Sequence, residues 1–229
     1  MTAEYAGPII EMRHVDKHFG QLHVLKDINL TVDKGEVVVL IGPSGSGKST
    51  LCRTINRLET IDSGEILFQG VKLPEEGKEL AALRAEIGMV FQSFNLFAHR
   101  TILDNVTMGP IEVLRKPKKE AEEEAMELLR RVGVAEQAAK VPAQLSGGQQ
   151  QRVAIARAVV ADPKLILADE PTGNLDSKNG KEVMDLLKEL NAEGTTIVMV
   201  THSQKDAAQA QRTIDLFDGQ IVSDVKNEL

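Results

Sequence analysis

GPSGSGKST, residues Gly42 to Thr50, is the stretch that decides how the rest of this chain is interpreted. It matches the pattern G-x-x-x-x-G-K-[ST]. Glycines let the backbone curl so that successive N–H groups point at phosphate oxygens. The pattern therefore predicts a phosphate-binding loop, and the residues assigned to nucleotide binding are Gly42, Pro43, Ser44, Gly45, Ser46, Gly47, Lys48, Ser49 and Thr50.

The sequence on either side of the loop supports this interpretation. An apolar run at Val37 to Ile41 predicts a strand before it, and Leu51 to Leu58 predicts a helix after it. The helix presents its positive end to the same anion. Lys48 can then reach the β- and γ-phosphates, and the Ser49 hydroxyl can ligate Mg²⁺. A glycine-rich turn without a ligand is the alternative, and the strand and helix argue against it.

Composition limits the class of protein. The chain has 229 residues, 42% of them hydrophobic and 27% charged, which is typical of a globular protein. Its net charge of −7 argues against nucleic-acid binding as the main function, because backbone phosphates need a basic surface. The single cysteine, Cys52, allows no intrachain disulfide. We expect no signal peptide and no membrane span, and hence a cytoplasmic protein.

Hydrophobic periodicity predicts an α/β fold. Ile9 to Val15, Leu22 to Val32 and Glu65 to Phe68 read as strands of an N-terminal antiparallel β layer. Apolar strands at Ile87 to Phe91 and Leu165 to Ala168 are separated by helical patterns, which indicates a mostly parallel sheet. Further elements are expected as helices at Glu75 to Glu86 and Lys181 to Leu190, a strand at Thr195 to Thr201, and two short strands within Ile214 to Val222.

A change in composition marks an inserted α-helical lobe. Residues 102–134 are rich in Glu, Lys, Ala and Leu, with Pro117 placed as the first residue of a helix. Gly133 suits the position after the end of that helix. We predict one domain over 1–229, with an α/β nucleotide-binding core at 1–91 and 163–229 and the helical lobe at 92–162.

Two acids follow the apolar strand of LILADEP, residues Leu165 to Pro171. A buried parallel strand brings residues at its carboxyl end to the ligand crevice. Asp169 is predicted to hold Mg²⁺, and Glu170 to polarise the attacking water. A strand followed by a capping acid is the alternative.

A third motif, LSGGQQQR at Leu145 to Arg152, adds a second anion site. Ser146 is a good N-cap, and Gly147 and Gly148 leave backbone N–H groups uncovered at a helix start. The order of phosphate loop, Gln92, LSGGQ, LILADEP and His202 resembles the ATP-binding subunits of ABC transporters, over nearly the whole chain. These subunits are P-loop NTPases that use ATP and Mg²⁺.

The resemblance implies further site residues. Phe19 stands where the family stacks an aromatic ring on adenine, although a core residue of the hairpin is the alternative, and Val24 is included with the nucleotide-binding positions. Gln92 would touch Mg²⁺ and the attacking water, and His202 would bind the γ-phosphate and orient the water. The catalytic group is then Lys48, Gln92, Glu170 and His202, and the metal group is Ser49, Gln92 and Asp169.

The resemblance also implies partners. In a head-to-tail homodimer, each ATP would lie between the phosphate loop of one subunit and Ser146, Gly147, Gly148 and Gln149 of the other, with Asp176 at the interface. Integral membrane permease subunits would hold the dimer on the cytoplasmic face of the inner membrane. An importer would also use a solute-binding protein. No nucleic-acid partner is expected.

Two transporter branches compete. Gly88 to Pro110 and the phosphate loop resemble polar amino-acid importers, whereas ADPKLILADEPTGNLDS resembles the lipoprotein-release and macrolide-efflux branch. The chain is thus either a divergent natural member or a recombinant joined near Ala156 to Asp162, with amino-acid import favoured for the partner. Non-transport relatives, such as regulatory or DNA-maintenance ATPases, form another class. This chain lacks the long coiled coil that DNA-maintenance ATPases insert.

Overall fold

The computed structural model describes residues 5–227, and its strands form two separate sheets. The strands are β1 (Ile10–Phe19), β2 (Leu22–Val32), β3 (Val37–Ile41), β4 (Ser63–Phe68), β5 (Val71–Lys72), β6 (Ile87–Phe91), β7 (Leu165–Asp169), β8 (Thr196–Val200), β9 (Arg212–Phe217) and β10 (Gln220–Lys226). The larger sheet has the order β10-β9-β3-β8-β7-β6 and is parallel except for β10. The smaller sheet, β2-β1-β4-β5, is antiparallel throughout.

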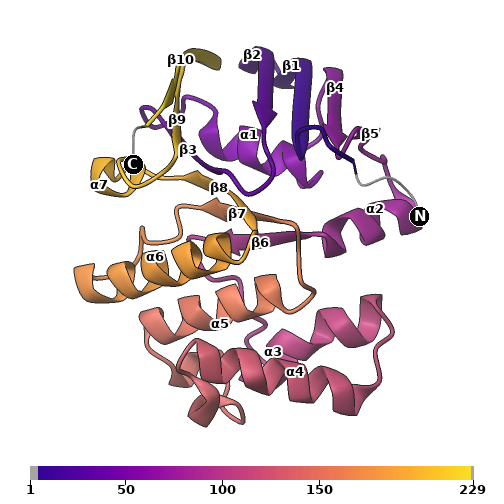
Figure 1. The fold of residues 1–229 in the computed structure, drawn as a ribbon, viewed down its shortest axis with the longest axis vertical. Helices are drawn as coiled ribbons and strands as arrows, with labels where there is room; N and C mark the ends of the chain where they lie inside the picture. The colour runs from indigo at the N-terminus through magenta and orange to yellow at the C-terminus, as the bar shows by residue number, and fades with distance from the viewer. Residues whose placement is uncertain (1–4, 228–229) are drawn as a thin grey trace.

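The helices lie on both sides of the larger sheet. They are α1 (Lys48–Ile55), α2 (Gly77–Ala85), α3 (Ile102–Met108), α4 (Lys118–Arg131), α5 (Gly147–Val159), α6 (Ser177–Ala192) and the short α7 (Gln204–Ala207), with a π-helical turn at Gly109–Val113 and 3₁₀ turns at Ala135–Gln137 and Pro142–Gln144. Figure 1 shows α1 between the two sheets, α5 and α6 below the larger sheet, and α3 and α4 beyond α5.

Alternation along the parallel strands divides the core in two. Val38 of β3 packs with Leu51 of α1 and with the smaller sheet. Val39, the next residue, packs on the opposite face with Ile155 of α5. The central strands β3, β7 and β8 are apolar on both faces for this reason. As a result, α1 and α5 lie on opposite sides of one sheet.

The predicted fold class is confirmed, whereas several boundaries are wrong. The helix predicted from Leu51 begins at Lys48, because Gly47, at φ 103°, leads directly from the loop into the first turn. Pro117 is the N-cap of α4 and not its first residue, since its ψ of 136° is extended. The α6 helix begins earlier than expected because Asp176 caps it. Of the described part of the chain, no helix is long and apolar enough to cross a membrane.

Candidate functional site

The phosphate loop joins the carboxyl end of β3 to α1 and depends on its glycines. Gly42 has φ 133°, and a Cβ atom there would lie 2.0 Å from the carbonyl oxygen of Leu216. Gly47, at φ 103°, passes close to Val24, whose carbonyl oxygen would be 2.8 Å from an added Cβ. Only glycine fits both close approaches without strain. This packing also places Val24 against the loop, while its role in nucleotide binding stays a prediction.

Lys48 lies inside the curl of this loop. Its Nζ atom donates to the carbonyl oxygens of Gly42 and Pro43, at 2.9 and 2.8 Å, and the residue is 5% exposed. Burial lowers the pKa of this amine, and the nearby carboxylates of Glu170 and Asp169 oppose that shift. The loop therefore carries a buried positive charge within a ring of backbone groups, which suits a polyphosphate.

Asp169 ends β7 beside the start of α1. Its Oδ1 atom accepts from the Ser49 hydroxyl at 2.7 Å. Its Oδ2 atom accepts from Nε and Nη2 of Arg53, at 3.1 and 2.8 Å. The aspartate is 4% exposed, and both of its carboxylate oxygens accept hydrogen bonds from protein groups. The structure thus joins the two predicted metal residues Ser49 and Asp169 and adds Arg53, which sequence reasoning missed.

Glu170 and His202 form a pair at the same edge of the sheet. The strand register places Asp169 opposite Val200, so the residues after β7 and β8 meet. Glu170 Oε1 lies 2.8 Å from His202 Nε2. Burial raises the pKa of the Glu170 carboxyl, while His202 and Lys48 act in the opposite direction. A carboxylate paired with an imidazole can orient a water molecule and accept its proton.

Gln92 follows β6, the neighbour of β7, and lies next to the turn after Glu170. Its backbone oxygen accepts from Asn174 Nδ2 at 3.0 Å, and its side chain donates to Asn174 Oδ1 at 3.4 Å. A Cβ atom on Gly173 would be 2.8 Å from Gln92 Nε2. Gln92 is therefore close to the predicted catalytic edge and tied to the 173–174 turn, a tie that sequence reasoning did not foresee.

The LSGGQ segment forms the N-terminus of α5. Ser146 Oγ accepts from the Gln149 N–H at 3.3 Å, and the Gln149 side chain accepts from the Ser146 N–H at 2.9 Å. This reciprocal pair is a capping box. Since α5 and α1 occupy opposite faces of the larger sheet, one chain does not bring its LSGGQ segment together with its own phosphate loop.

Asp176 caps the neighbouring helix and is linked to the LSGGQ segment. Its Oδ1 atom accepts from the N–H groups of Lys178 and Asn179, at 3.0 and 2.9 Å, and these bonds lower the pKa of its carboxyl. The Asn179 amide also donates to Asp176 Oδ2 at 2.7 Å. A Cβ atom on Gly148 would be 2.0 Å from Asn179 Oδ1, so this glycine lets α5 and α6 approach closely.

The predicted adenine contact lies on the surface. Phe19 ends β1, is 45% exposed, and has the Lys17 amine 5.0 Å from its ring centroid. The alternative of a hairpin core residue is wrong for this ring, because nearly half of it faces solvent. An exposed aromatic face is available for stacking.

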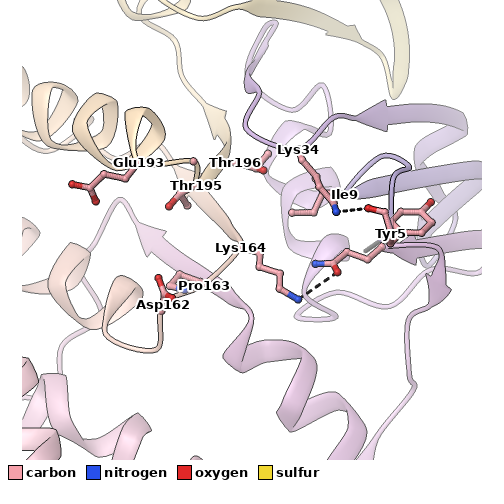
Figure 2. A pocket seen from close by; sticks show the side chains of 11 residues that line it. Tyr5, Ile9, Lys34, Asp162, Pro163, Lys164, Glu193, Thr195 and Thr196 are labelled. Carbon is pink, nitrogen blue, oxygen red and sulfur yellow. Dashed lines mark hydrogen bonds between the residues drawn. The ribbon is translucent and has the colours of Figure 1, made fainter. Parts of the chain in front are cut away.

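The cavity in Figure 2 is separate from this constellation. It has a volume of about 540 Å³ and lies at the amino ends of β7 and β8, at the opposite edge of the sheet from Lys48. Lys34 donates to the backbone oxygen of Tyr5, and Lys164 donates to Gln69 at 3.3 Å, as the dashed lines mark. None of the predicted site residues lines it.

Comparison with known proteins identifies relatives over nearly the whole chain. Residues 25–173 match the family model described as "ABC transporter". The chain is 59% identical over 219 residues to the glutamate transport ATP-binding protein GluA of Corynebacterium glutamicum, covering 95% of this chain and 90% of the relative. It is 52% identical over 221 residues to the glutamine transport ATP-binding protein GlnQ of Geobacillus stearothermophilus, covering 96% and 91%.

Solved structures agree with the fold. A dimeric structure of a bacterial ABC transporter cassette has a TM-score of 0.89 at 41% identity, covering 96% of this chain and 99% of the other. A dimeric post-hydrolysis state bound to ADP and Pi has a TM-score of 0.88 at 40% identity, with the same coverage. A recombinant junction within 156–162 finds no support, since single relatives match on both sides of it.

Proposed function

Because this chain belongs to the ABC transporter family, we propose that it is the ATP-hydrolysing subunit of a transporter that takes up polar amino acids. The hydrolytic part rests on one observation above all, the Glu170–His202 pair beside the loop that buries Lys48. The cargo rests on the relatives, which are named for glutamate and glutamine transport. The glutamate and glutamine transport relatives match nearly the whole chain, including the segment ADPKLILADEPTGNLDS. This match favours amino-acid uptake over the lipoprotein-release and macrolide-efflux alternative.

The reaction converts ATP and water to ADP and phosphate. The loop N–H groups and Lys48 hold the β- and γ-phosphates. Glu170 accepts a proton as the water oxygen bonds to the γ-phosphorus, and the bond from that phosphorus to the bridging oxygen of ADP breaks. His202 orients Glu170 through their 2.8 Å contact and reaches the γ-phosphate. Positioning and charge neutralisation supply most of the acceleration in such transfers.

The donor set also fits Mg²⁺. A hydroxyl and a carboxylate, Ser49 and Asp169, place oxygens 2.7 Å apart beside the loop, and oxygen is the ligand that Mg²⁺ prefers. Gln92 would supply a third, amide oxygen. When bound, the ion would neutralise phosphate charge. The remaining oxygen of Asp169 stays with Arg53, which keeps that carboxylate in place.

We propose that the complete site needs two subunits. The LSGGQ segment, Ser146 to Gln149, lies on the other side of the larger sheet from its own phosphate loop, and two solved structures of one relative are dimeric. In the proposed homodimer, Ser146, Gly147 and Gly148 contact the ATP held by the partner, and Asp176 lies near the interface. ATP then joins the subunits, and its hydrolysis releases them.

The permease would dock in a groove of about 520 Å³ on the flank of β6. Gly88, Phe91, Pro110, Val113 and Arg157 are among its lining residues, so the groove joins the β6 edge to α5 and the π-helical turn. It lies next to Gln92, which gives a membrane partner a short path to the catalytic edge. We also propose that the chain divides into a core, 1–91 with 163–229, and a lobe, 92–162, because this groove is lined by residues from both segments. The dimer would sit on the cytoplasmic face of the membrane and serve a solute-binding protein.

Glu170→Gln tests the ATPase assignment. The amide cannot accept the proton, so we expect ATP binding to persist, turnover to fall by about 10³-fold or more, and ATP to trap a dimer in size-exclusion chromatography. Glu79→Gln, on the exposed face of α2, is the matched control and should hydrolyse ATP normally. A Glu170→Gln protein with normal turnover would show that another group is the base.

The cargo needs its own test. Copurified with its permease in lipid vesicles, the subunit should hydrolyse ATP faster when a solute-binding protein loaded with glutamate or glutamine is added. Stimulation by other cargo and not by polar amino acids would refute the uptake assignment and leave the ATPase assignment standing.

A further inference from the structure

Gln151 is a fully buried polar residue on α5, five residues after Ser146. Its Nε2 atom donates to the carbonyl oxygen of Phe91 at 3.3 Å and to that of Pro171 at 2.6 Å. Phe91 directly precedes Gln92, and Pro171 directly follows Glu170. One side chain thus binds the backbone next to two of the proposed catalytic residues, from a helix that neither of them belongs to.

The orientation of this amide is fixed. Within residues 5–227, Gln151 Oε1 is buried and has no hydrogen-bond partner. If the amide were turned over, Oε1 would face the carbonyl oxygens of Phe91 and Pro171. All three of these atoms are acceptors, so both hydrogen bonds would be lost. A buried oxygen without a donor is costly, and such cases need a reason. The reason here is the pair of carbonyl oxygens of Phe91 and Pro171, which need an NH₂ group to bridge them.

Arg157, nearly two turns further along α5, holds the same segment from its other side. Its Nη1 atom donates to the carbonyl oxygen of Asn95 at 2.6 Å, and Nη2 donates to that of Phe94 at 3.0 Å. Phe94 and Asn95 both have positive φ, at 59° and 52°, so this strained turn is kept in place by the contacts around it. The backbone on both sides of Gln92 is therefore bound to one helix.

The two ends of this arrangement serve different ATP molecules if the subunit dimerises as proposed. The first residues of α5, from Ser146, reach the ATP of the partner. Gln151, on the same rigid helix, fixes the backbone beside Gln92 and Glu170 of its own subunit. We propose that Gln151 is a positioning residue that couples the two ATP sites, so that engagement of the LSGGQ segment in one site sets the catalytic edge of the other. This inference rests on the proposed function, and in particular on the two-subunit site.

Gln151→Met tests the coupling, with Gln150→Met as the matched control. Both changes remove an amide from α5, but the Gln150 amide donates to Leu145 within its own segment, at 3.1 Å, and to no other group of residues 5–227. The ATPase rate is measured against ATP concentration at a temperature where each variant is folded by circular dichroism. In the wild type and in Gln150→Met, we expect a Hill coefficient above 1, approaching the number of sites.

For Gln151→Met, we expect the Hill coefficient to fall to about 1 and kcat to fall by about 10- to 100-fold, with half-saturating ATP changed less than about 2-fold. A role in packing alone would lower thermal stability and leave the Hill coefficient unchanged. If Gln151→Met does not fold, Gln151→Asn, which keeps a shorter amide, should show the same effects in weaker form.

The outcomes separate the two proposals. A wild type without ATPase activity, or a Glu170→Gln protein that ATP does not dimerise, would refute the proposed function itself. A wild type that passes both tests, combined with a Gln151 variant whose Hill coefficient and kcat match those of Gln150→Met, would refute the coupling role alone.

Discussion

The contact between Arg53 and Asp169 allows a quantitative prediction. Arg53→Met keeps the length of the stem and removes both N–H groups that Asp169 Oδ2 now accepts. Asp169 is 4% exposed, so this oxygen would lose its donors in a place that water scarcely reaches. Breaking a fully buried ion pair costs about 3 to 5 kcal/mol, and a hydrogen bond to a charged group is worth about 1.5 to 3 kcal/mol.

Exposure of the partner decides between these ranges. The Arg53 side chain is 42% exposed, so solvent screens the pair and water can partly replace the guanidinium. We therefore expect Arg53→Met to lower the free energy of unfolding by about 1.5 to 3 kcal/mol. For a chain of this size, that corresponds to a fall in melting temperature of roughly 3 to 12 °C.

The assay is thermal and urea unfolding without nucleotide, with Arg13→Met as the matched control. Arg13 also contacts two acids, Glu11 and Glu65, but neither is buried as Asp169 is, since their side chains are 25% and 37% exposed. The Arg13 side chain is 49% exposed, so the midpoint of Arg13→Met should stay near the wild-type value. The double variant Arg53→Met/Asp169→Asn should lose less than the sum of the single changes, because the unpaired charge is gone. Equal shifts for Arg53→Met and Arg13→Met, or strict additivity, would refute the argument from burial.

Two further predictions concern the loop and the C-terminal hairpin. Gly42→Ala should cost about 3 kcal/mol or more in urea unfolding and abolish ATP binding, because its Cβ would meet the Leu216 carbonyl at 2.0 Å, whereas Gly45→Ala, with φ 80° and open space, should cost about 1 to 2 kcal/mol; equal losses would contradict this. Hydrogen bonds from Arg212 hold the pKa of Asp224 below its usual range, so the pair stabilises the fold above about pH 4 and that contribution is lost as the pH falls through the lowered pKa. Asp224→Asn should thus be less stable than the wild type at pH 7, by about 1 kcal/mol or less, with a difference that vanishes in acid; a difference that persists there would assign the effect to packing.

Much of the site could be predicted from the sequence because its signals are local. The phosphate loop, the two acids at the end of β7 and the N-cap at Ser146 each depend on residues within a few positions of one another. The parallel sheet then brings Asp169, Glu170 and His202 to one edge by a general rule about strand ends. These predictions needed no knowledge of which helix covers which face.

Other contacts depend on that knowledge and could not be predicted. Arg53 and Asp169 are 116 positions apart, and their contact requires α1 to pack across the end of β7. Gln151 looked like part of a polar helix start, yet it is fully buried because α5 packs against β6. Periodicity shows that a helix has an apolar face but not which backbone carbonyls lie beneath it. The exact start of α1 was likewise set by the loop and not by the apolar pattern.

The doubly covered sheet is also what makes a second copy necessary in the proposed mechanism. Val38 and Val39 point in opposite directions from one strand, and α1 and α5 each cover one of these faces. Two layers packed on either side of a sheet cannot approach each other without unfolding the core between them. In the proposed mechanism, the LSGGQ segment therefore meets a phosphate loop on another subunit. The same helix α5 also contacts the sheet, because Gln151 donates to the backbone beside Gln92 and Glu170. This contact would couple the two ATP sites.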